Sequence, residues 1–288
     1  MSIHHLFARG VLLAALSLSP MMAKAAQSFE SCTGFIDSLP ATISTQGVWC
    51  LRKDLSTAIT GAAAIQINAN NVTIDCNHFK LGGLSAGAGA DASGIAATNK
   101  HNITVRHCHV RGFYSGVFLS GGGHVVENNR FDRNTSAGVD VSGDRSVVRH
   151  NLILDTGGSS LFEGEATGIR TMGEVDVLDN TVSGVSPINS NSDFSWSYAT
   201  GIYAAHNTSG SINNNRVRGL RLPGMGAMFG IAIVQGSRVA VRNNDISGLG
   251  SGTGIDCSDD TSIAVANVIN GFTVPIAVCA DNENFSNP

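Results

Sequence analysis

Residues 116–141 of the chain read GVFLSGGGHVVENNRFDRNTSAGVDV, and they hold one complete unit of the pattern that decides the fold. Gly116 opens a run in which apolar residues alternate with other residues, and the same run starts again at Gly138, 22 residues later. Between them, a polar turn leads to a second short alternation and then to Asn129, with Phe131 two residues further on. Alternation with a period of two is typical of strands with one buried face. The unit therefore predicts short strands joined by tight turns.

The same unit recurs about eight times along the chain. Its glycine stands at Gly94, Gly116, Gly138, Gly168, Gly201, Gly230 and Gly254. Its second marker stands at Asn77, Cys108, Asn129, Asn151, Asn180, Asn215, Asn244 and Asn267. A single turn of chain is unable to bury its apolar face alone, whereas stacked turns bury it against one another. We expect the Asn residues to form a column at a tight bend, to adopt left-handed torsions there and to pass amide hydrogen bonds from coil to coil.

A repeat of 22 residues suits a coil of three short strands and is too long for a six-residue left-handed repeat. With its Gly-apolar-x-apolar strand and its Asn ladder, the chain resembles the right-handed parallel β-helix, or pectin-lyase-like, superfamily over residues 64–280. The resemblance implies an all-β fold, a single-stranded right-handed parallel β-helix solenoid of about eight coils. We expect residues 26–63 to form an N-terminal cap and residues 64–288 to form the β-helix.

Composition and the first residues agree with an exported β protein. Of 288 residues, 42% are hydrophobic and only 14% charged, with 34 glycines, which makes an all-helical fold improbable. Residues 1–25 read as a signal peptide, because Arg9 precedes a short apolar run and Ala23-Lys24-Ala25 supplies a cleavage site. The run is too short to span a membrane. We expect a secreted protein, periplasmic or extracellular, that is a monomer and has no membrane partner.

The six cysteines of the chain are an even number in an oxidising compartment, so disulfides are expected. Cys32 and Cys50 close a loop in the cap, and Cys257 and Cys279 are 22 residues, or one coil, apart. Cys76 and Cys108 lie at nearly equivalent bends of the first two coils, where the strand spacing is within disulfide reach. Because no pair has Cys-x-x-Cys spacing, a zinc ribbon or thioredoxin-like site is disfavoured.

The coils grow longer in the middle of the chain, where successive glycines of the repeat are 30, 33 and 29 residues apart. The additions lie at residues 157–167, 185–200 and 220–229, each just before the Gly-apolar strand. Loops inserted at one place in successive coils stack on one edge and form a wall. We expect that wall to contain Phe162, Glu163, Glu165, Asp193, Phe194, Trp196, Tyr198, Met225 and Met228. Within it, Glu163, Glu165, Asp193, Trp196 and Tyr198 are the candidate substrate-binding residues.

Beside the wall, the outward position of the first strand carries Asp140, Arg170 and Tyr203 on consecutive coils. Strand spacing would place neighbours about 4.8 Å apart. These three residues and His206, at the next bend, are the candidate catalytic residues. In β-elimination of a uronic-acid polymer, Arg170 would neutralise the substrate carboxylate and Tyr203 or His206 would act as base and acid. Flat faces of Trp196 and Tyr198 would contact sugar rings.

The same residues also fit other interpretations. Asp140 and Arg170 are also suited to a purely structural cross-strand ion pair, like the alternating series Asp75, Arg106, Glu127 and Arg149. Glycoside hydrolysis would need paired carboxylates, for which Asp140 with Glu163 or Glu165, and Asp256 with Asp259 or Asp260, are candidates. The chain lacks the catalytic motifs of polygalacturonases, pectate lyases and alginate epimerases. A non-catalytic glycan- or surface-binding protein is therefore the other alternative.

Charge and histidine content bear on the ligand. The formal net charge of −4 falls to −6 when Arg9 and Lys24 leave with the signal, which argues against nucleic acid and weakly against an acidic substrate. His78, His107, His109 and His150 share one part of the repeat, but no carboxylate is spaced with them as a metal site needs. We therefore expect a polysaccharide or glycan ligand, expect no metal and leave the cofactor unknown.

Overall fold

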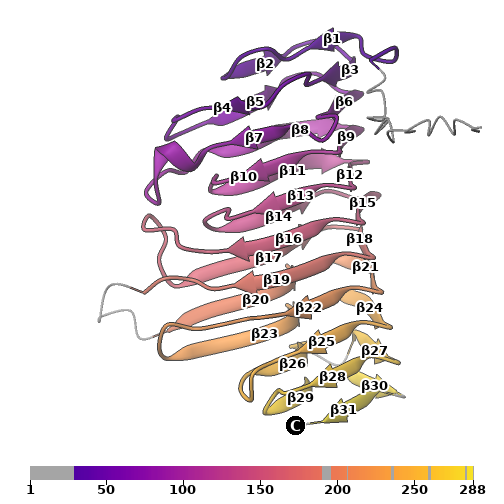
Figure 1. The fold of residues 1–288 in the computed structure, drawn as a ribbon. Coiled ribbons are helices and arrows are strands. Elements are labelled where there is room, and N and C mark those ends of the chain that lie inside the picture. Colours follow the sequence, from indigo (N-terminus) through magenta and orange to yellow (C-terminus); the bar gives the residue numbers. More distant parts are fainter. Residues whose placement is uncertain are drawn as a thin grey trace, which may run out of the picture.

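The computed structural model describes residues 29–189, 196–205, 207–234, 237–258, 261–282 and 284–287. In this part of the chain, short strands stack coil upon coil into a single column that runs from the first strand to the last (Figure 1). The proposed signal peptide lies outside the described residues.

Three parallel sheets form the walls of the column, and we name them sheets A, B and C. Sheet A contains β1 (Gly34–Phe35), β3 (Gly47–Cys50), β6 (Val72–Asp75), β9 (Ile103–Arg106), β12 (Val125–Glu127), β15 (Ser146–Arg149), β18 (Val175–Leu178), β21 (Ser209–Asn213), β24 (Arg238–Arg242), β27 (Ile263–Val265) and β30 (Ala280–Asn282). Sheet B contains β2 (Ala41–Ile43), β5 (Ala63–Ile67), β8 (Ser93–His101), β11 (Ser115–Gly122), β14 (Ala137–Ser142), β17 (Glu165–Met172), β20 (Ser197–Ala204), β23 (Gly226–Ile233), β26 (Thr253–Asp256) and β29 (Val274–Ala277). Sheet C contains β4 (Leu55–Ser56), β7 (Lys80–Gly82), β10 (His109–Arg111), β13 (Arg130–Asp132), β16 (Leu152–Thr156), β19 (Thr181–Val185), β22 (Arg216–Arg218), β25 (Asp245–Ser247), β28 (Val268–Asn270) and β31 (Phe285–Asn287).

Each coil visits the sheets in the order B, A, C, and each strand pairs in parallel with the equivalent strands of the coils before and after it. The predicted all-β parallel β-helix is therefore confirmed. The column has one more coil at each end than the sequence repeat indicates. Strands β2, β3 and β4 form a coil before the first repeat, and β29, β30 and β31 form one after the last. Among the described residues, the one helix is the 3₁₀ turn η1 (Leu84–Ala86), so none is long and apolar enough to cross a membrane.

The core is a narrow column of apolar side chains that all three sheets contribute. Val117 and Leu119 of β11 and Val139 and Val141 of β14 are fully buried, as their alternation predicts. Sheet C adds the residue that follows each ladder position from Cys108 to Asn267 by two, such as the fully buried Phe131. Every coil therefore buries its apolar face only where a neighbouring coil covers it, and the hydrophobic effect stabilises the stack rather than any single turn.

The Asn column is a continuous hydrogen-bonded ladder at the turns between sheets A and C. The side-chain oxygen of Asn180 accepts hydrogen bonds from the backbone N and the side-chain Nδ2 of Asn151, at 3.0 Å each. Its own Nδ2 donates to the Val148 carbonyl at 2.9 Å and to Asn215 Oδ1 at 3.0 Å. The same contacts run from Cys108 through to Asn284, and the ladder residues from Asn129 to Asn267 are buried.

One detail of the ladder differs from the sequence prediction. The left-handed torsion belongs in most coils to the residue just before the ladder Asn, as in Asn128 (φ 56°), Asn214 (φ 56°) and Asn243 (φ 53°). The left-handed residue turns the chain, and the next residue can then point its amide into the stack. In the coil of Asn77, the ladder residue is itself left-handed (φ 47°).

The glycine column has a steric origin. At Gly168, an added Cβ would collide with the Val182 side chain of sheet C and with the carbonyl oxygen of Gly201 in the next coil. Its counterparts from Gly94 to Gly254 face the same two kinds of neighbour. No side chain fits where the strand of sheet B passes this close to sheet C, so the repeat requires glycine there.

All three expected disulfides are present. Cys32 pairs with Cys50, Cys76 with Cys108, and Cys257 with Cys279, with Cα–Cα distances of 5.9, 4.7 and 5.0 Å. The first ties β3 to the segment before β1, and the other two each join one coil to the next. The bridges therefore lie towards the two ends of the column.

We predict that Asn180→Ala lowers the free energy of unfolding by about 3 kcal/mol or more, because buried backbone and amide groups of two adjacent coils lose their partners. Urea unfolding followed by circular dichroism measures the change. Asn270→Ala, at an exposed position of β28, is the matched control and should leave stability nearly unchanged. Equal effects of the two substitutions would contradict a structural role of the ladder.

Candidate functional site

Asp140, Arg170 and Tyr203 form the predicted row on the outer face of sheet B. Asp140 of β14 is in register with Arg170 of β17, which is in register with Tyr203 of β20. The row continues over Ala232 to Asp256. In-register parallel pairing, which stacks equivalent residues at about 4.8 Å, therefore brings the three candidate residues together.

The contact between Asp140 and Arg170 is a loose ion pair. Arg170 Nη1 lies 3.7 Å from Asp140 Oδ2, which is beyond hydrogen-bond distance. Burial raises the pKa of the Asp140 carboxyl, and the neighbouring Arg170 guanidinium offsets part of this effect. Arg170 Nε is buried and finds no hydrogen-bond partner among the described residues. The guanidinium is thus only partly satisfied by these residues, and because the side chain is about one third exposed, its outer Nη groups can donate to an anionic ligand.

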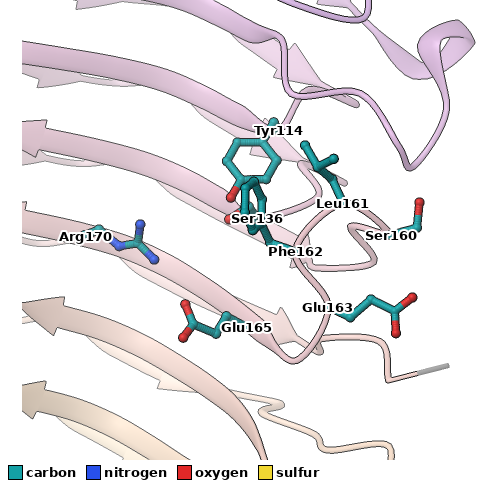
Figure 2. Close-up of a pocket in the computed structure, with 8 residues that line it drawn as sticks. All are labelled: Tyr114, Ser136, Ser160, Leu161, Phe162, Glu163, Glu165 and Arg170. Carbon is teal, nitrogen blue, oxygen red and sulfur yellow. The ribbon is translucent and has the colours of Figure 1, made fainter. Parts of the chain in front are cut away.

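A cleft of 520 Å³ lies on one side of Arg170, and Figure 2 shows the residues that line it. Its lining consists of Tyr114, Ser136, Ser160, Leu161, Phe162, Glu163, Glu165 and Arg170. The rings of Tyr114 and Phe162 meet edge to face, with centroids 5.8 Å apart, and so fix the loop after β16 against the start of β11. The cleft thus has one aromatic wall and one charged wall.

A second cleft, of 530 Å³, shares Glu165 and Arg170 with the first. It extends over the next coils and is lined by Glu165, Thr167, Arg170, Met172, Tyr198, Thr200, Tyr203, Ala205, Phe229, Ala232, Val234, Asp256 and Ser258. The small side chain of Ala232 leaves a hollow in the row between Tyr203 and Asp256. We call the two clefts together the sheet B groove, and Arg170 stands at their junction.

The inserted loops lie on one edge, as predicted, since each enters between a strand of sheet C and the next strand of sheet B. Among the described residues of the wall, Phe162, Glu163 and Glu165 line the first cleft and Tyr198 lines the second. Figure 2 shows the Glu163 carboxylate pointing away from Arg170, whereas Glu165 lies on the same side as Arg170. Asp193 and Phe194 lie outside the described residues.

The predicted site set is therefore not one constellation. Trp196, more than half exposed, lines a separate apolar cleft of 650 Å³ together with Met225 and Leu249. His206 lies outside the described residues, as do Asp259 and Asp260. Asp256 lines the second cleft and also accepts a hydrogen bond from the backbone N of Ser258.

Some groove residues escaped the sequence reasoning. Tyr114 and Phe229 line the groove, but neither occupies the outward position that was followed along the repeat. Tyr114 stands two residues before Gly116, and Phe229 directly before Gly230. Aromatic residues one or two positions before a repeat glycine are therefore the sequence signal that indicates both groove residues.

Among the described residues, no group of three or more His, Cys, Asp or Glu side chains is placed to hold a metal ion. The alternating series is present as two ion pairs, Asp75 with Arg106 at 2.8 Å and Glu127 with Arg149 at 2.6 Å.

Comparisons with known proteins agree on the architecture. Residues 54–189 match the family described as right handed beta helix region. The Dettilon tailspike protein has a similar structure, with 14% identity, a TM-score of 0.53, and coverage of 88% of this chain and 54% of its own. This chain thus spans about half the length of that relative.

Two further structures have lower scores. An alginate lyase from Paenibacillus sp. is 11% identical with a TM-score of 0.44, covering 86% of this chain and 99% of its own. The tailspike protein of E. coli bacteriophage HK620 in complex with pentasaccharide is 11% identical with a TM-score of 0.40, covering 89% and 57%. No curated protein matches the chain. These likenesses bear on the fold alone.

We predict that Asp140→Asn becomes increasingly stabilising, relative to the natural chain, as the pH rises from about 4 to about 7. The folded-state pKa of Asp140 is raised, so between the unfolded and folded values the folded protein binds more protons, and its stability falls as the pH rises through that window. Asparagine has no such proton to lose. Urea unfolding of both proteins across this pH range measures the difference.

Asp37→Asn is the control with the opposite sign. The pKa of the exposed Asp37 is lowered by its hydrogen bond to Arg52, so the natural carboxyl adds stability above the unfolded value and loses it as the pH falls. The relative stability of Asp37→Asn should therefore decline as the pH rises towards the unfolded-state pKa of about 4 and stay flat above it, so this control is also measured below pH 4. If the stability of Asp140→Asn relative to the natural chain stays constant or falls as the pH rises, burial does not raise the pKa of Asp140.

Proposed function

We propose that this chain, a right-handed parallel β-helix, is a secreted carbohydrate-active protein that binds an acidic polysaccharide along the sheet B groove. The observation that carries the proposal is the partly satisfied guanidinium of Arg170, which stands where the two clefts meet. The lining of the groove runs from Tyr114, just before β11, to Asp256 of β26, so it can follow a chain of sugar units across successive coils. A uronate carboxylate fits a guanidinium that has donors free in a partly buried position.

The rest of the groove suits sugar rings. Tyr114 and Phe162 on one side, and Tyr198 and Phe229 on the other, offer apolar faces near the charged centre. Exposed aromatic rings packed beside polar groups are favourable surfaces for the apolar faces of pyranose rings. Thr167, Thr200 and Ser136 provide hydroxyl groups that can exchange hydrogen bonds with a sugar.

β-Elimination is the reaction that these residues support. Arg170 would neutralise the uronate carboxylate and so lower the cost of removing the proton on the adjacent ring carbon. Tyr203, one strand away, would take that proton as its phenolate, and the pair of electrons left behind would form a carbon–carbon double bond as the glycosidic bond to oxygen breaks. A proton returned from Tyr203 would complete the departing hydroxyl, so water is not consumed.

Glycoside hydrolysis is less well supported by the groove. Glu165 and Arg170 are five residues apart on one strand, about 16 Å at 3.3 Å per residue, and Asp140 is opposite Arg170. Hydrolysis needs carboxyl groups about 5 to 10 Å apart. Asp140 and Glu165 are thus a poor pair, and the Glu163 carboxylate points away (Figure 2).

Export is part of the proposal. The three disulfides are typical of an oxidising compartment, and we propose that residues 1–25 are removed as a signal peptide and that residues 26–63 cap the column. The mass of the protein recovered from the periplasm or the medium tests the cleavage.

For binding, we predict that Arg170→Gln weakens the affinity for polygalacturonate or alginate at least tenfold, because a charge-assisted contact with the uronate is lost. Affinity electrophoresis or fluorescence anisotropy with labelled oligosaccharides measures the loss. Arg238→Gln, an exposed arginine of sheet A, is the matched control and should bind like the natural chain. If both variants bind equally well, the groove is not the binding site.

For catalysis, we predict that the natural protein generates unsaturated uronates and new reducing ends together, and that Tyr203→Phe abolishes both while binding is retained. Ultraviolet absorbance and a reducing-end assay on a panel of acidic and neutral polysaccharides measure the two products. Reducing ends without absorbance would replace elimination by hydrolysis. Binding without any product would leave a non-catalytic glycan-binding protein.

A further inference from the structure

Another cleft lies away from the sheet B groove, at the turns between sheets A and C. It has a volume of 460 Å³ and is lined by His78, His107, Cys108, His109, Asn128, Asn129, Arg130 and His150. The four histidines come from three different coils, and the whole chain has only nine. His78 and His107 are close neighbours, with ring centroids 5.0 Å apart. We call this the histidine cleft.

The turn itself does not require histidine. His107 (φ 52°) and His150 (φ 54°) occupy the left-handed position directly before the ladder residue, and Asn128, Asn214 and Asn243 fill the same position in other coils. Asparagine is well suited to this torsion. Histidine therefore adds something at this corner that turn geometry alone does not ask for, namely a side chain whose charge depends on pH.

The residues that line the cleft carry positive charge, and the acids near it are already paired. Among the described residues that line it, Arg130 is the fixed charge and none is an acid. The nearby acids each already contact cationic or histidine partners. These contacts join Asp75 to Arg106 at 2.8 Å and to His107 at 3.2 Å, Asp132 to His109 at 3.5 Å, to Arg130 at 3.5 Å and to Arg133 at 3.8 Å, Asp179 to His150 at 3.6 Å, and Asp54 to Lys80 at 3.2 Å.

The remaining charged neighbour on sheet C is Arg111, which acts on His109 with the same sign as Arg130. Burial lowers the pKa of His109, and Asp132 only partly offsets that effect. Because the acids are fewer than the cations once the histidines are protonated, acidification leaves a strong excess of positive charge facing the cleft. A metal ion is a poor occupant, since no three ligating side chains in the described part of the chain converge on one point.

We infer that the histidine cleft is a second ligand site, which binds a polyvalent oxyanion at acidic pH and releases it near neutrality. A protonated imidazole can donate from both ring nitrogens, so a histidine with one nitrogen facing an acid keeps the other for the anion, and Arg130 adds a permanent cation. The shared chemistry is a group of closely spaced phosphate or sulfate oxygens, whether on a small free anion or on a polymer. This site is independent of the proposed function, because the groove lies on sheet B.

Isothermal titration of the full mature chain with tripolyphosphate at pH 5.5 and pH 7.5 tests the inference. We expect binding at least tenfold tighter at the lower pH. The double variant His107→Asn, His150→Asn should lose at least tenfold in affinity at pH 5.5 and lose most of the pH dependence. Asparagine is the residue that other coils use at this position, so the turn is retained, and circular dichroism verifies the fold. A parallel titration with dextran sulfate separates a free anion from a polymer-borne one.

His101→Asn is the matched control, because His101 is exposed at the end of β8 and does not line the cleft. It should bind tripolyphosphate like the natural chain. The inference is overturned if the natural chain binds equally at both pH values, if the folded double variant binds as tightly as the natural chain at pH 5.5, or if His101→Asn weakens binding as much as the double variant does.

Discussion

In-register parallel pairing of successive coils is the constraint on which the rest of this structure depends. Each residue lies over the equivalent residue of the previous coil at about 4.8 Å, so any position must tolerate its own copy as a neighbour. The buried amide of Asn151 can satisfy that of Asn180, and Gly168 fits against Gly201 where a Cβ would collide. The two markers of the repeat are the side chains that this geometry accepts at its tightest places.

The same constraint decides where the protein can vary. Core positions and ladder positions are fixed by the neighbours above and below, whereas the connections from sheet C to sheet B face outward and can lengthen. Three successive connections do so. Residues of the first form one side of the sheet B groove, whereas Trp196 and Met225 of the next two line the separate apolar cleft. The histidine cleft arises differently, by replacing the side chain at an existing left-handed turn without any change in coil length.

Much of this could be predicted from the sequence because the repeat converts spacing into position. The fold, the three disulfides, the Asn ladder and the adjacency of Asp140, Arg170 and Tyr203 all follow from counting residues within a coil. The same counting says nothing of loop conformation, so it grouped Trp196 with the Arg170 site although Trp196 lines another cleft. It also assigned the left-handed torsion to the ladder Asn, because sequence alone does not separate two adjacent turn residues.

The location of the disulfides has a consequence for how the column comes apart. A linear stack ordinarily frays from its ends, since a terminal coil has only one neighbour. Here Cys32–Cys50 and Cys76–Cys108 clasp the first coils and Cys257–Cys279 clasps the last two, while the coils from β11 to β25 have none. Oxidation therefore opposes fraying at both ends, whereas the middle coils, which include most of the sheet B groove, are held by non-covalent contacts alone. A ligand bound along the groove would contact several of these coils at once and so stabilise the part of the column that has no disulfide.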